Sequence, residues 1–432
     1  MAMLGGSLLH GGPLGAQQSS DSAAVRQQRS LDSLSAALRA MASRVDSLQR
    51  AQVPPPPAAR PPGAYMNVSF VGLTNFGWSS TPDVASLQLG DHDPKVRGFT
   101  IPNAELVFDG AVDPYFKAFT AIVYKIDEGG ETGVELEEMY LLSTGLPKNL
   151  QLKVGQFFTE FGRQNQQHPH AWAFADQPLI LGRMFGPDGL RSQGARLSWL
   201  LPTSWYTEAM LGVINSAGGT TFSFRSDESS AIHGGAPVDR AVENAADMLY
   251  VPRITTSFEP TDNQVWLVGA SGAFGPNNSG AKSRTSIHGG DVYWKWKSSY
   301  ANQGFPFVSF QGEYLHRTYD AASRAVVDDP AEALPAESLR DDGMYAQLLW
   351  GIKPRVVAGI RAEHASANAG AFATTAERAD RSRFSPNITW YPSEYSKVRL
   401  QYNFDRRVGL GNDHSVWIQL EFLLGAHAAH KF

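Results

Sequence analysis

The chain contains no cysteine, which excludes disulfide frameworks, thiolate metal sites and cysteine nucleophiles. It also has no run of roughly 18 apolar residues, so it offers no candidate for a transmembrane helix. No strong excess of one charge is present, because the net charge is only −5 over 432 residues, and this argues against a global nucleic-acid-binding surface. Walker, Rossmann and G-x-S-x-G motifs are absent as well. The sequence therefore predicts no enzyme, no cofactor and no nucleic-acid partner.

Alternation of apolar and polar residues dominates the stretch from Tyr395 to Gly425. A period of two over about ten residues is typical of a β-strand with one apolar and one polar face. In a soluble sandwich the polar face would meet water. In a membrane barrel the apolar face meets lipid and the polar face meets a wet lumen. The apolar set comprises Val416, Ile418, Leu420, Phe422 and Leu424, and the polar set Ser415, Gln419 and Glu421.

The same alternation recurs through residues 65–432 and predicts about sixteen strands. Tight connections, often with proline, alternate with mostly long polar ones, as in outer-membrane barrels with short periplasmic turns and long external loops. We therefore predict an all-β fold, a transmembrane antiparallel β-barrel. The predicted strands are 65–78, 97–110, 114–127, 134–145, 150–161, 192–202, 205–217, 246–260, 263–275, 286–299, 304–319, 340–352, 354–366, 381–391, 395–406 and 414–425.

The first 64 residues differ in character and divide into three segments. Residues 1–20 are apolar and rich in small residues, which indicates a signal-like segment or, alternatively, a disordered terminus. Residues 21–52 place apolar side chains at a 3-4 spacing from Leu31 to Leu48, which predicts a coiled-coil helix. An amphipathic helix lying on its own chain is the alternative. Residues 53–64 are rich in proline and predict a stiff linker.

The long loop 162–191 is the best candidate for a site, because structureless loops of about thirty residues are unusual and tend to be functional. It either enters the lumen and sets its narrowest cross-section or caps the outside. It also carries His168-Pro-His170, whose spacing, like that of His427 and His430, could bind a metal. No fixed carboxylate or cysteine set accompanies these residues, so we interpret them as loop and tail histidines and predict no metal site.

Strand phase predicts which charges face inward. Acidic positions such as Glu105, Glu135 and Glu137 concentrate on residues 97–145, and basic positions on residues 286–406. Opposed walls of this kind create a transverse field that filters ions, whereas simple pairing of lumen charges is the alternative. Arg355, Arg361, Arg383, Lys397 and Arg399 are expected to form one basic wall on three adjacent strands. The predicted pore-lining residues are Lys153, Arg163, Arg183, Arg191, Arg196, Lys295, Arg317, Arg355, Arg361, Arg383, Lys397 and Arg399.

The chain resembles the phosphate-selective porin (porin O/P) family of outer-membrane channels. The resemblance rests on a coiled-coil segment ahead of a sixteen-strand pattern and on two motifs. Leu152-KVGQFFTEFGRQ resembles that family's strand leading into its long third loop, and Gly189-LRSQGARLSWLLP resembles the return strand. The resemblance implies a trimeric, passively conducting pore whose third loop folds inward.

We therefore predict a bacterial outer-membrane porin that passes small hydrophilic solutes by passive diffusion, with a weak preference for anions, phosphate included. A plugless outer-membrane receptor and a barrel-borne hydrolase are the alternatives. The expected partners are outer-membrane lipid, small anions or hydrophilic solutes, and the other copies of a homotrimer. The N-terminal coil would then lie in the periplasm.

Overall fold

The structure is a computed structural model that describes residues 65–127, 129–226, 230–233, 242–302, 304–324, 333–371 and 378–425. The signal-like segment, coiled coil and linker predicted for residues 1–64 lie outside the described residues, as do His427 and His430. Among the residues described, no helix is both long and apolar enough to cross a membrane.

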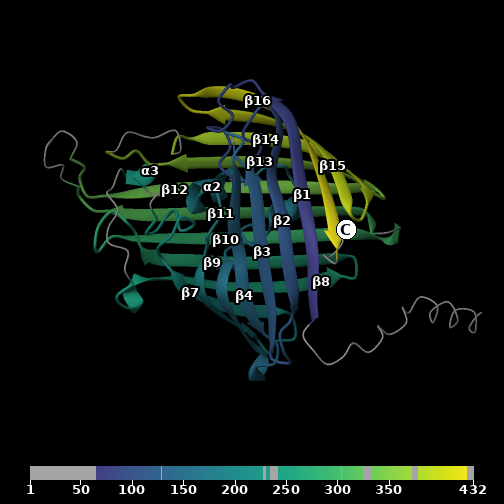
Figure 1. Cartoon of the computed structure of the whole chain (residues 1–432), viewed down its shortest axis with the longest axis horizontal. Coiled ribbons are helices and arrows are strands. Elements are labelled where there is room, and N and C mark those ends of the chain that lie inside the picture. The colour runs from purple at the N-terminus through teal and green to yellow at the C-terminus, as the bar shows by residue number, and fades with distance from the viewer. Residues whose placement is uncertain are drawn as a thin grey trace, which may run out of the picture. The chain divides into compact units, whose positions relative to one another are not determined.

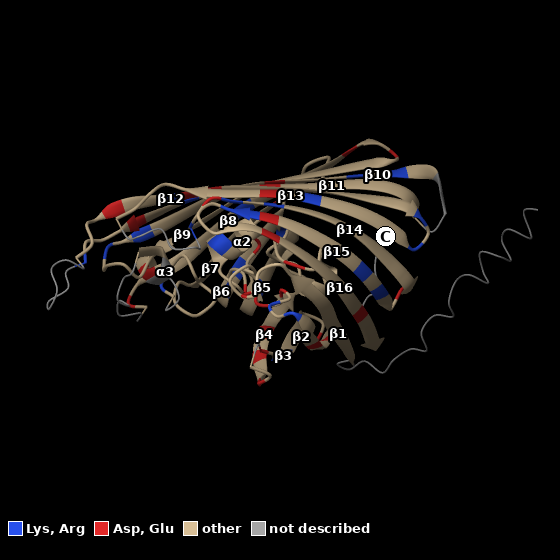
Figure 2. Ribbon diagram, turned by 90° about the horizontal axis from the view of Figure 1, so that it is seen from above, with Lys and Arg blue, Asp and Glu red and all other residues tan. Residues whose placement is uncertain are grey.

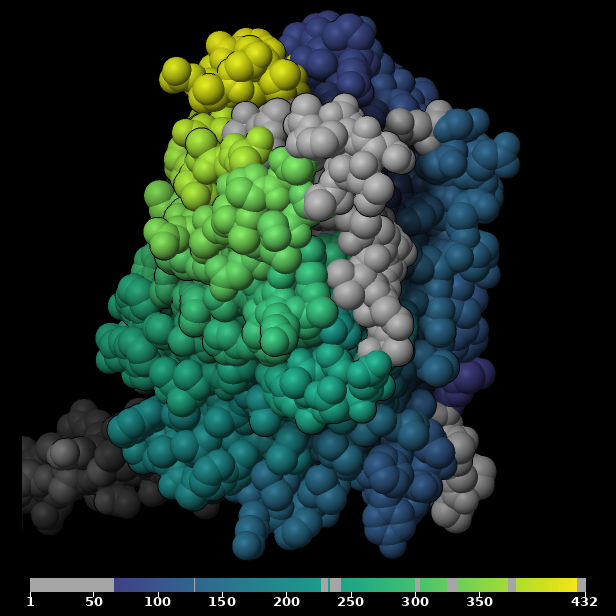
Figure 3. All heavy atoms as spheres, turned by 90° about the vertical axis from the view of Figure 1, so that its left-hand side faces the viewer, coloured from purple at the N-terminus to yellow at the C-terminus, as the bar shows by residue number. Residues whose placement is uncertain are grey.

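Sixteen antiparallel strands form a closed barrel (Figure 1). Each strand pairs with its neighbours in sequence, and β16 pairs with β1 to close the ring, so the yellow C-terminal strands lie beside the purple N-terminal part in Figure 3. The sixteen-strand antiparallel prediction is thereby confirmed. The strands are β1 (Tyr65–Ser79), β2 (Gly98–Ala111), β3 (Phe116–Ile126), β4 (Thr132–Ser143), β5 (Leu150–Phe158), β6 (Arg191–Leu200), β7 (Thr207–Asn215), β8 (Met248–Thr261), β9 (Gln264–Pro276), β10 (Arg284–Asn302), β11 (Phe305–Ala321), β12 (Glu337–Lys353), β13 (Val356–Ala367), β14 (Arg381–Ser393), β15 (Ser396–Arg407) and β16 (Gly411–Gly425).

The outer surface of the barrel is apolar, as the alternation on β16 illustrates. Leu420 and Leu424 are 47% and 59% exposed, whereas Gln419 and Glu421, on either side of Leu420, are each 3% exposed. Successive side chains of a strand point to opposite faces, so the apolar set lies outside and the polar set inside. An apolar surface that continues from strand to strand is not stable in water, and it fits the lipid-facing band of a membrane barrel.

Short helices occur in the connections. They are η1 (Pro147–Asn149), η2 (Pro169–Ala171), α2 (Leu179–Phe185), α3 (Ser230–His233) and η4 (Ala245–Asp247). Both η2 and α2 belong to the long connection between β5 and β6, residues 159–190, which we call the inserted loop. All seven residues of α2 are buried, and the helix packs against β11, β12 and β13. The loop therefore enters the barrel rather than capping its outside.

Apolar side chains fill part of the barrel interior, in addition to the polar side chains that face inward from the strands. Leu181, Met184 and Phe185 of the inserted loop belong to one buried cluster with inward side chains of several strands. Glycine makes room for this packing, since a side chain at Gly343 on β12 would overlap Ile180 of α2. The wall members of the cluster are Phe157, Ile214, Leu249, Val251, Ala273, Ile287, Leu315, Tyr345 and Ala365.

Candidate functional site

Asp176 of the inserted loop is the centre of a buried polar network on β13, β14 and β15. Its carboxylate contacts the guanidinium of Arg361, and its Oδ2 atom lies 3.1 Å from Nη1 of Arg383. It also accepts hydrogen bonds from Gln401 at 2.9 Å and Asn403 at 2.7 Å. Burial alone would raise the pKa of Asp176, but the two arginines outweigh it and hold the pKa below its ordinary value.

Basic side chains of the barrel wall also bind backbone carbonyl groups of the loops. Lys397 donates to the oxygen of His170 at 2.5 Å, and Arg399 donates to that of Trp172 at 2.8 Å. Arg383 reaches a second connection, residues 80–97, where it donates to the oxygen of Leu87 at 3.0 Å. Charged donors to carbonyl groups form strong hydrogen bonds, so this wall fixes two loops inside the barrel.

Four residues of the predicted basic wall lie on the inner face of the barrel, and contacts engage their charges. Arg361, Arg383, Lys397 and Arg399 are all buried, and they lie on the adjacent strands β13, β14 and β15. Carboxylates stand among them, since Lys397 lies 2.6 Å from Glu421 and Arg361 lies 2.8 Å from Glu363. Figure 2 shows blue and red segments on the same strands. These contacts favour the alternative in which the lumen charges pair, and the role of the wall toward solutes stays a prediction.

Arg355 does not belong to this wall, and its predicted place on a strand is wrong. It lies in the turn between β12 and β13 with a φ angle of 70°. The side chain is exposed, and Nη1 donates to the oxygen of Pro392 at 3.1 Å. Alternation continues through this tight turn, so the sequence pattern does not reveal that β13 begins only at Val356.

Other predicted pore-lining residues also contact neighbours inside the barrel. Lys153 and Arg196 flank Glu160 at 2.6 and 3.2 Å, and Arg191 forms an ion pair with Glu135. Two more stack on aromatic rings: the Arg163 guanidinium lies 4.0 Å from the ring centre of Tyr293, and Lys295 Nζ lies 4.7 Å from that of Phe307. Arg317 binds Asp341 at 2.7 Å.

A cavity of about 250 Å³ gathers positive charge beside α2. Its lining includes Arg183, Arg317, Arg378 and Lys95. Burial and the neighbouring arginines lower the pKa of Arg183 to about 10, although Asp341 acts in the opposite direction. Nε of Arg183 has no hydrogen-bond partner among the described residues. The cavity therefore combines a positive potential with an unused donor.

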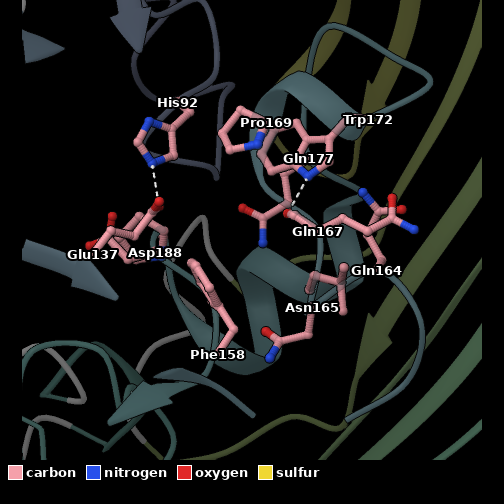
Figure 4. A pocket seen from close by; sticks show the side chains of 13 residues that line it. His92, Glu137, Phe158, Gln164, Asn165, Gln167, Pro169, Trp172, Gln177 and Asp188 are labelled. Carbon is pink, nitrogen blue, oxygen red and sulfur yellow. Dashed lines mark hydrogen bonds and ion pairs between the residues drawn. The ribbon is translucent and has the colours of Figure 1, made fainter. Parts of the chain in front are cut away.

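His168 of the inserted loop and His92 of the connection 80–97 contact glutamates on β2 and β4. Nδ1 of His168 lies 3.0 Å from Oε1 of Glu105 and 2.9 Å from Oε2 of Glu137, and its Nε2 lies 2.8 Å from Glu138. His92 reaches Glu137 at 3.5 Å, and Figure 4 shows its ring directed at that carboxylate. Burial would lower the pKa of His168, but Glu105 and Glu137 outweigh it and raise the pKa well above its usual value.

A β-bulge brings two consecutive glutamates of β4 to the interior. The register with β3 shifts so that Ala121 faces Glu138 while Ile122 faces Leu136, leaving Glu137 without a partner in the ladder. Glu137 and Glu138 are 1% and 6% exposed, so both are inside. Strict alternation predicts Glu137 inside and Glu138 outside, so the sequence pattern misses Glu138. It also misses His92, which lies in a connection with no pattern of its own.

These features define a class of protein. A closed barrel of sixteen antiparallel strands, with an apolar exterior, a charged interior and an inserted loop, has the architecture of an outer-membrane porin. Solved structures agree on the fold. The anion-selective porin from Comamonas acidovorans has a TM-score of 0.53 at 8% identity, covering 84% of this chain and 100% of that one. The DcaP channel of Acinetobacter baumannii has a TM-score of 0.52 at 12% identity, covering 84% and 99%.

A curated relative shows the family. The chain is 31% identical over 357 residues to an uncharacterized protein of Aquifex aeolicus (strain VF5), covering 78% of this chain and 70% of the relative. The chain therefore belongs to the family of that protein. No family model matches the chain. A third solved structure, Pseudomonas putida OprB, has a TM-score of 0.50 at 9% identity, covering 84% of this chain and 94% of that one. Membership of the phosphate-selective family remains a prediction.

Proposed function

We propose that the protein is a porin of the bacterial outer membrane that lets small hydrophilic solutes pass by passive diffusion. The observation that carries the proposal is the closed barrel whose apolar face is outside and whose charged face is inside. In membrane barrels of this kind, a polar inner face lines a water-filled channel. The inserted loop contacts the wall on β2, β4 and β11 to β15, so we expect a narrow passage and small solutes.

A weak preference for anions, phosphate included, is the second part of the proposal. Its support is the cavity beside α2, where Arg183, Arg317 and Arg378 come together. Guanidinium groups keep their charge at any physiological pH and bind phosphate or carboxylate through two hydrogen bonds. The preference is expected to be weak because Asp341 pairs with Arg317 of the cavity and Glu363 pairs with Arg361 of the wall.

Conductance through a planar bilayer tests this function. Purified full-length protein should produce stable ion-conducting steps, and the reversal potential in a KCl gradient should indicate modest selectivity for chloride. Absence of conductance from protein that is folded and inserted would overturn the porin proposal. A clear preference for potassium would overturn only the anion preference.

The hydrolase alternative has one contact in its favour. Nδ1 of His364 lies 2.9 Å from the hydroxyl of Ser382, the pairing that activates a serine nucleophile. Both residues are outside the interior set of β13 and β14, and among the described residues no carboxylate or amide contacts the His364 ring to orient it. We therefore retain the porin as the proposal.

Assembly is also a proposal. We expect a homotrimer, with residues 21–52 forming a coiled coil in the periplasm and residues 53–64 linking it to the barrel. The support is the spacing of apolar residues from Leu31 to Leu48. Mass measurement of the intact protein in mild detergent, compared with protein lacking residues 21–62, tests it. A monomeric intact protein would contradict the proposal.

A further inference from the structure

We propose that Glu105, Glu137 and His168 form a binding site for a divalent transition-metal ion that ties the inserted loop to the acidic wall. The ligand atoms are Oε1 of Glu105 on β2, Oε2 of Glu137 on β4 and Nδ1 of His168 in the loop. Side chains from three separate segments converge at this point. The two glutamates are 0% and 1% exposed, so the site lies inside the barrel.

The three ligand atoms converge at ion-pair distance, but none of them forms a hydrogen bond of regular geometry. Nδ1 of His168 lies 3.0 and 2.9 Å from the two carboxylate oxygens, and among the described residues no well-aligned hydrogen bond satisfies any of the three atoms. Buried polar atoms nearly always form hydrogen bonds, so three that lack a well-aligned one and face the same point need an explanation. A cation at that point provides it. Two atoms bonded to the same ion at right angles through bonds of about 2.1 Å are about 3.0 Å apart.

The residues around the site supply the outer contacts that metal ligands require. Nε2 of His168 lies 2.8 Å from Oε2 of Glu138, so Glu138 can accept a hydrogen bond from an Nε2–H group and leave the Nδ1 lone pair free. Glu138 is itself fixed by the backbone N–H of Phe158 at 3.0 Å. The second oxygens of the two ligating carboxylates also have partners. His170 lies 3.1 Å from Oε2 of Glu105, and His92 lies 3.5 Å from Oε1 of Glu137.

The β-bulge of β4 explains why the site and its support occur together. Glu137 is the unpaired residue of the bulge, and Glu138 follows it on the same inner face. A regular strand would turn one of these two side chains outward. The bulge therefore supplies a ligand and the acceptor for the ligating histidine from consecutive positions. Bulges are enriched beside functional sites for this reason.

The ligand chemistry selects the class of ion. One imidazole nitrogen with two carboxylate oxygens suits Mn²⁺, Fe²⁺, Co²⁺, Ni²⁺ or Zn²⁺ rather than Ca²⁺ or Mg²⁺, which prefer oxygen alone. Two carboxylates and a neutral histidine carry two negative charges, to which Glu138 adds one and which Arg191, 3.9 Å from Oε1 of Glu137, offsets in part, so a divalent ion meets a net negative site. A cavity of about 20 Å³ bordering Glu137 has room for a water molecule near the ion. A proton on His168 is the competing occupant, and the experiment must separate the two.

Metal binding by the full-length, untagged protein in detergent tests the site. After treatment with a chelator, the protein should bind about one Mn²⁺ or Zn²⁺ per chain, measured by titration calorimetry and elemental analysis. His168→Gln and Glu105→Gln should abolish binding, and Glu138→Gln should weaken it by about 10- to 100-fold. His316→Gln is the matched control, since His316 also faces a carboxylate, Asp342 at 2.9 Å, and its loss should change nothing.

Electron spin-echo spectroscopy of bound Mn²⁺ adds a measurement that needs no variant. The wild-type spectrum should contain modulation from one imidazole nitrogen, which His168→Gln removes and His316→Gln retains. A folded wild-type protein that binds no stoichiometric metal would overturn the proposal and leave a proton as the occupant. Binding that survives both triad substitutions, or that disappears when His427 and His430 are replaced by Gln, would also overturn it.

Discussion

Asp176 lies 3.1 Å from Arg383, although the two residues are 207 positions apart in the chain. This ion pair joins the inserted loop to β14 in the middle of a network that also holds Arg361 and Asp405. Both partners are buried, so removing Asp176 takes one of two carboxylates from Arg383, which keeps Asp405 at 2.8 Å. The position of the loop thus depends on a few charged contacts as well as on the packing of α2.

Replacing Asp176 with Asn should release the loop. The change removes one carboxylate shared by Arg361 and Arg383, which keep Glu363 and Asp405, so the cost should stay below the roughly 3–5 kcal/mol of a buried charge left without any partner. If the porin proposal holds, single-channel conductance should rise and become noisier, and the loop should become sensitive to protease. Asp342→Asn is the control, because Asp342 is half-exposed on the outer face and pairs with His316. Unchanged conductance and protease resistance in Asp176→Asn would show that packing alone fixes the loop.

Replacing Gly343 with Ala should displace α2. A β-carbon at Gly343 would overlap the side chain of Ile180 and approach the carbonyl oxygen of His364 at 3.0 Å, so the helix or the strand must shift. Overpacking of this kind costs about 1–3 kcal/mol. Thermal unfolding in detergent and bilayer conductance should both change. Gly290→Ala is the control, since a β-carbon there meets nothing within 4 Å. Equal melting temperatures for the two variants would contradict the packing described for α2.

The strand pattern could be predicted from the sequence because lipid and a polar interior impose alternation on every strand. Leu420 and Gln419 follow that rule, and so do their neighbours on β16. Turns and bulges obey other constraints. Arg355 continues the alternation of β13 but sits in the turn, and Glu138 breaks the alternation because Glu137 is bulged.

The candidate site could be predicted only in part. Alternation places the charges of β13 to β15 inside, but what they contact depends on where the inserted loop folds, and no local pattern encodes that. The apolar run from Leu179 to Phe185 is the available signal, since an exposed external loop has little reason to carry Leu179, Ile180 and Leu181 in succession. The same holds for His92, whose role depends on the connection 80–97 reaching Glu137.

Asp93 should make the contact between the connection 80–97 and the inserted loop sensitive to pH. Its carboxylate accepts hydrogen bonds from the backbone N–H groups of Gln177 at 2.7 Å and Gly90 at 2.8 Å. Burial, with Asp176 nearby, raises the pKa of Asp93 from 3.8 to about 6. The folded state therefore holds a proton that the unfolded state loses, and stability falls as the pH rises from about 4 to about 6, by up to about 3 kcal/mol.

Hydrogen exchange followed by mass spectrometry checks this, after correction for the intrinsic pH dependence of exchange. Amides of residues 80–97 should be better protected at about pH 4 than at about pH 7. Asp93→Asn, which stays uncharged, should remove most of that difference. Asp83→Asn is the control, because Asp83 lies in the same connection and, among the residues described, its carboxylate accepts only the exposed N–H of Ser86. Protection that increases with pH in the wild type would contradict the expected sign of the pH dependence.

Selectivity should depend on the cavity beside α2 more than on the wall of β13 to β15. The wall side chains bind loops and carboxylates: Arg361, Arg383, Lys397 and Arg399. Replacing them is therefore expected to displace the loops as well as to change the electric field in the pore. Arg183 lines the cavity with an unused Nε donor, and its other contacts are with the backbone carbonyl groups of Arg378 and Ala379. Its charge can therefore be removed without breaking an ion pair.

Arg183→Gln combined with Lys95→Gln should shift the reversal potential in a KCl gradient toward cations, because two of the positive charges around the cavity disappear. Lys95 pairs with Asp91 at 3.2 Å, and Asp91 keeps Lys125 as a partner in the variant. The shift should shrink at high salt, where the screening length falls from about 10 Å at 0.1 M to about 3 Å at 1 M. Arg97→Gln serves as the control: Arg97 belongs to the same connection as Lys95, but it is exposed and donates to the oxygen of Ser80. An equal shift from Arg97→Gln would assign the selectivity to surface charge. No shift from the double variant would show that the cavity does not lie on the ion pathway.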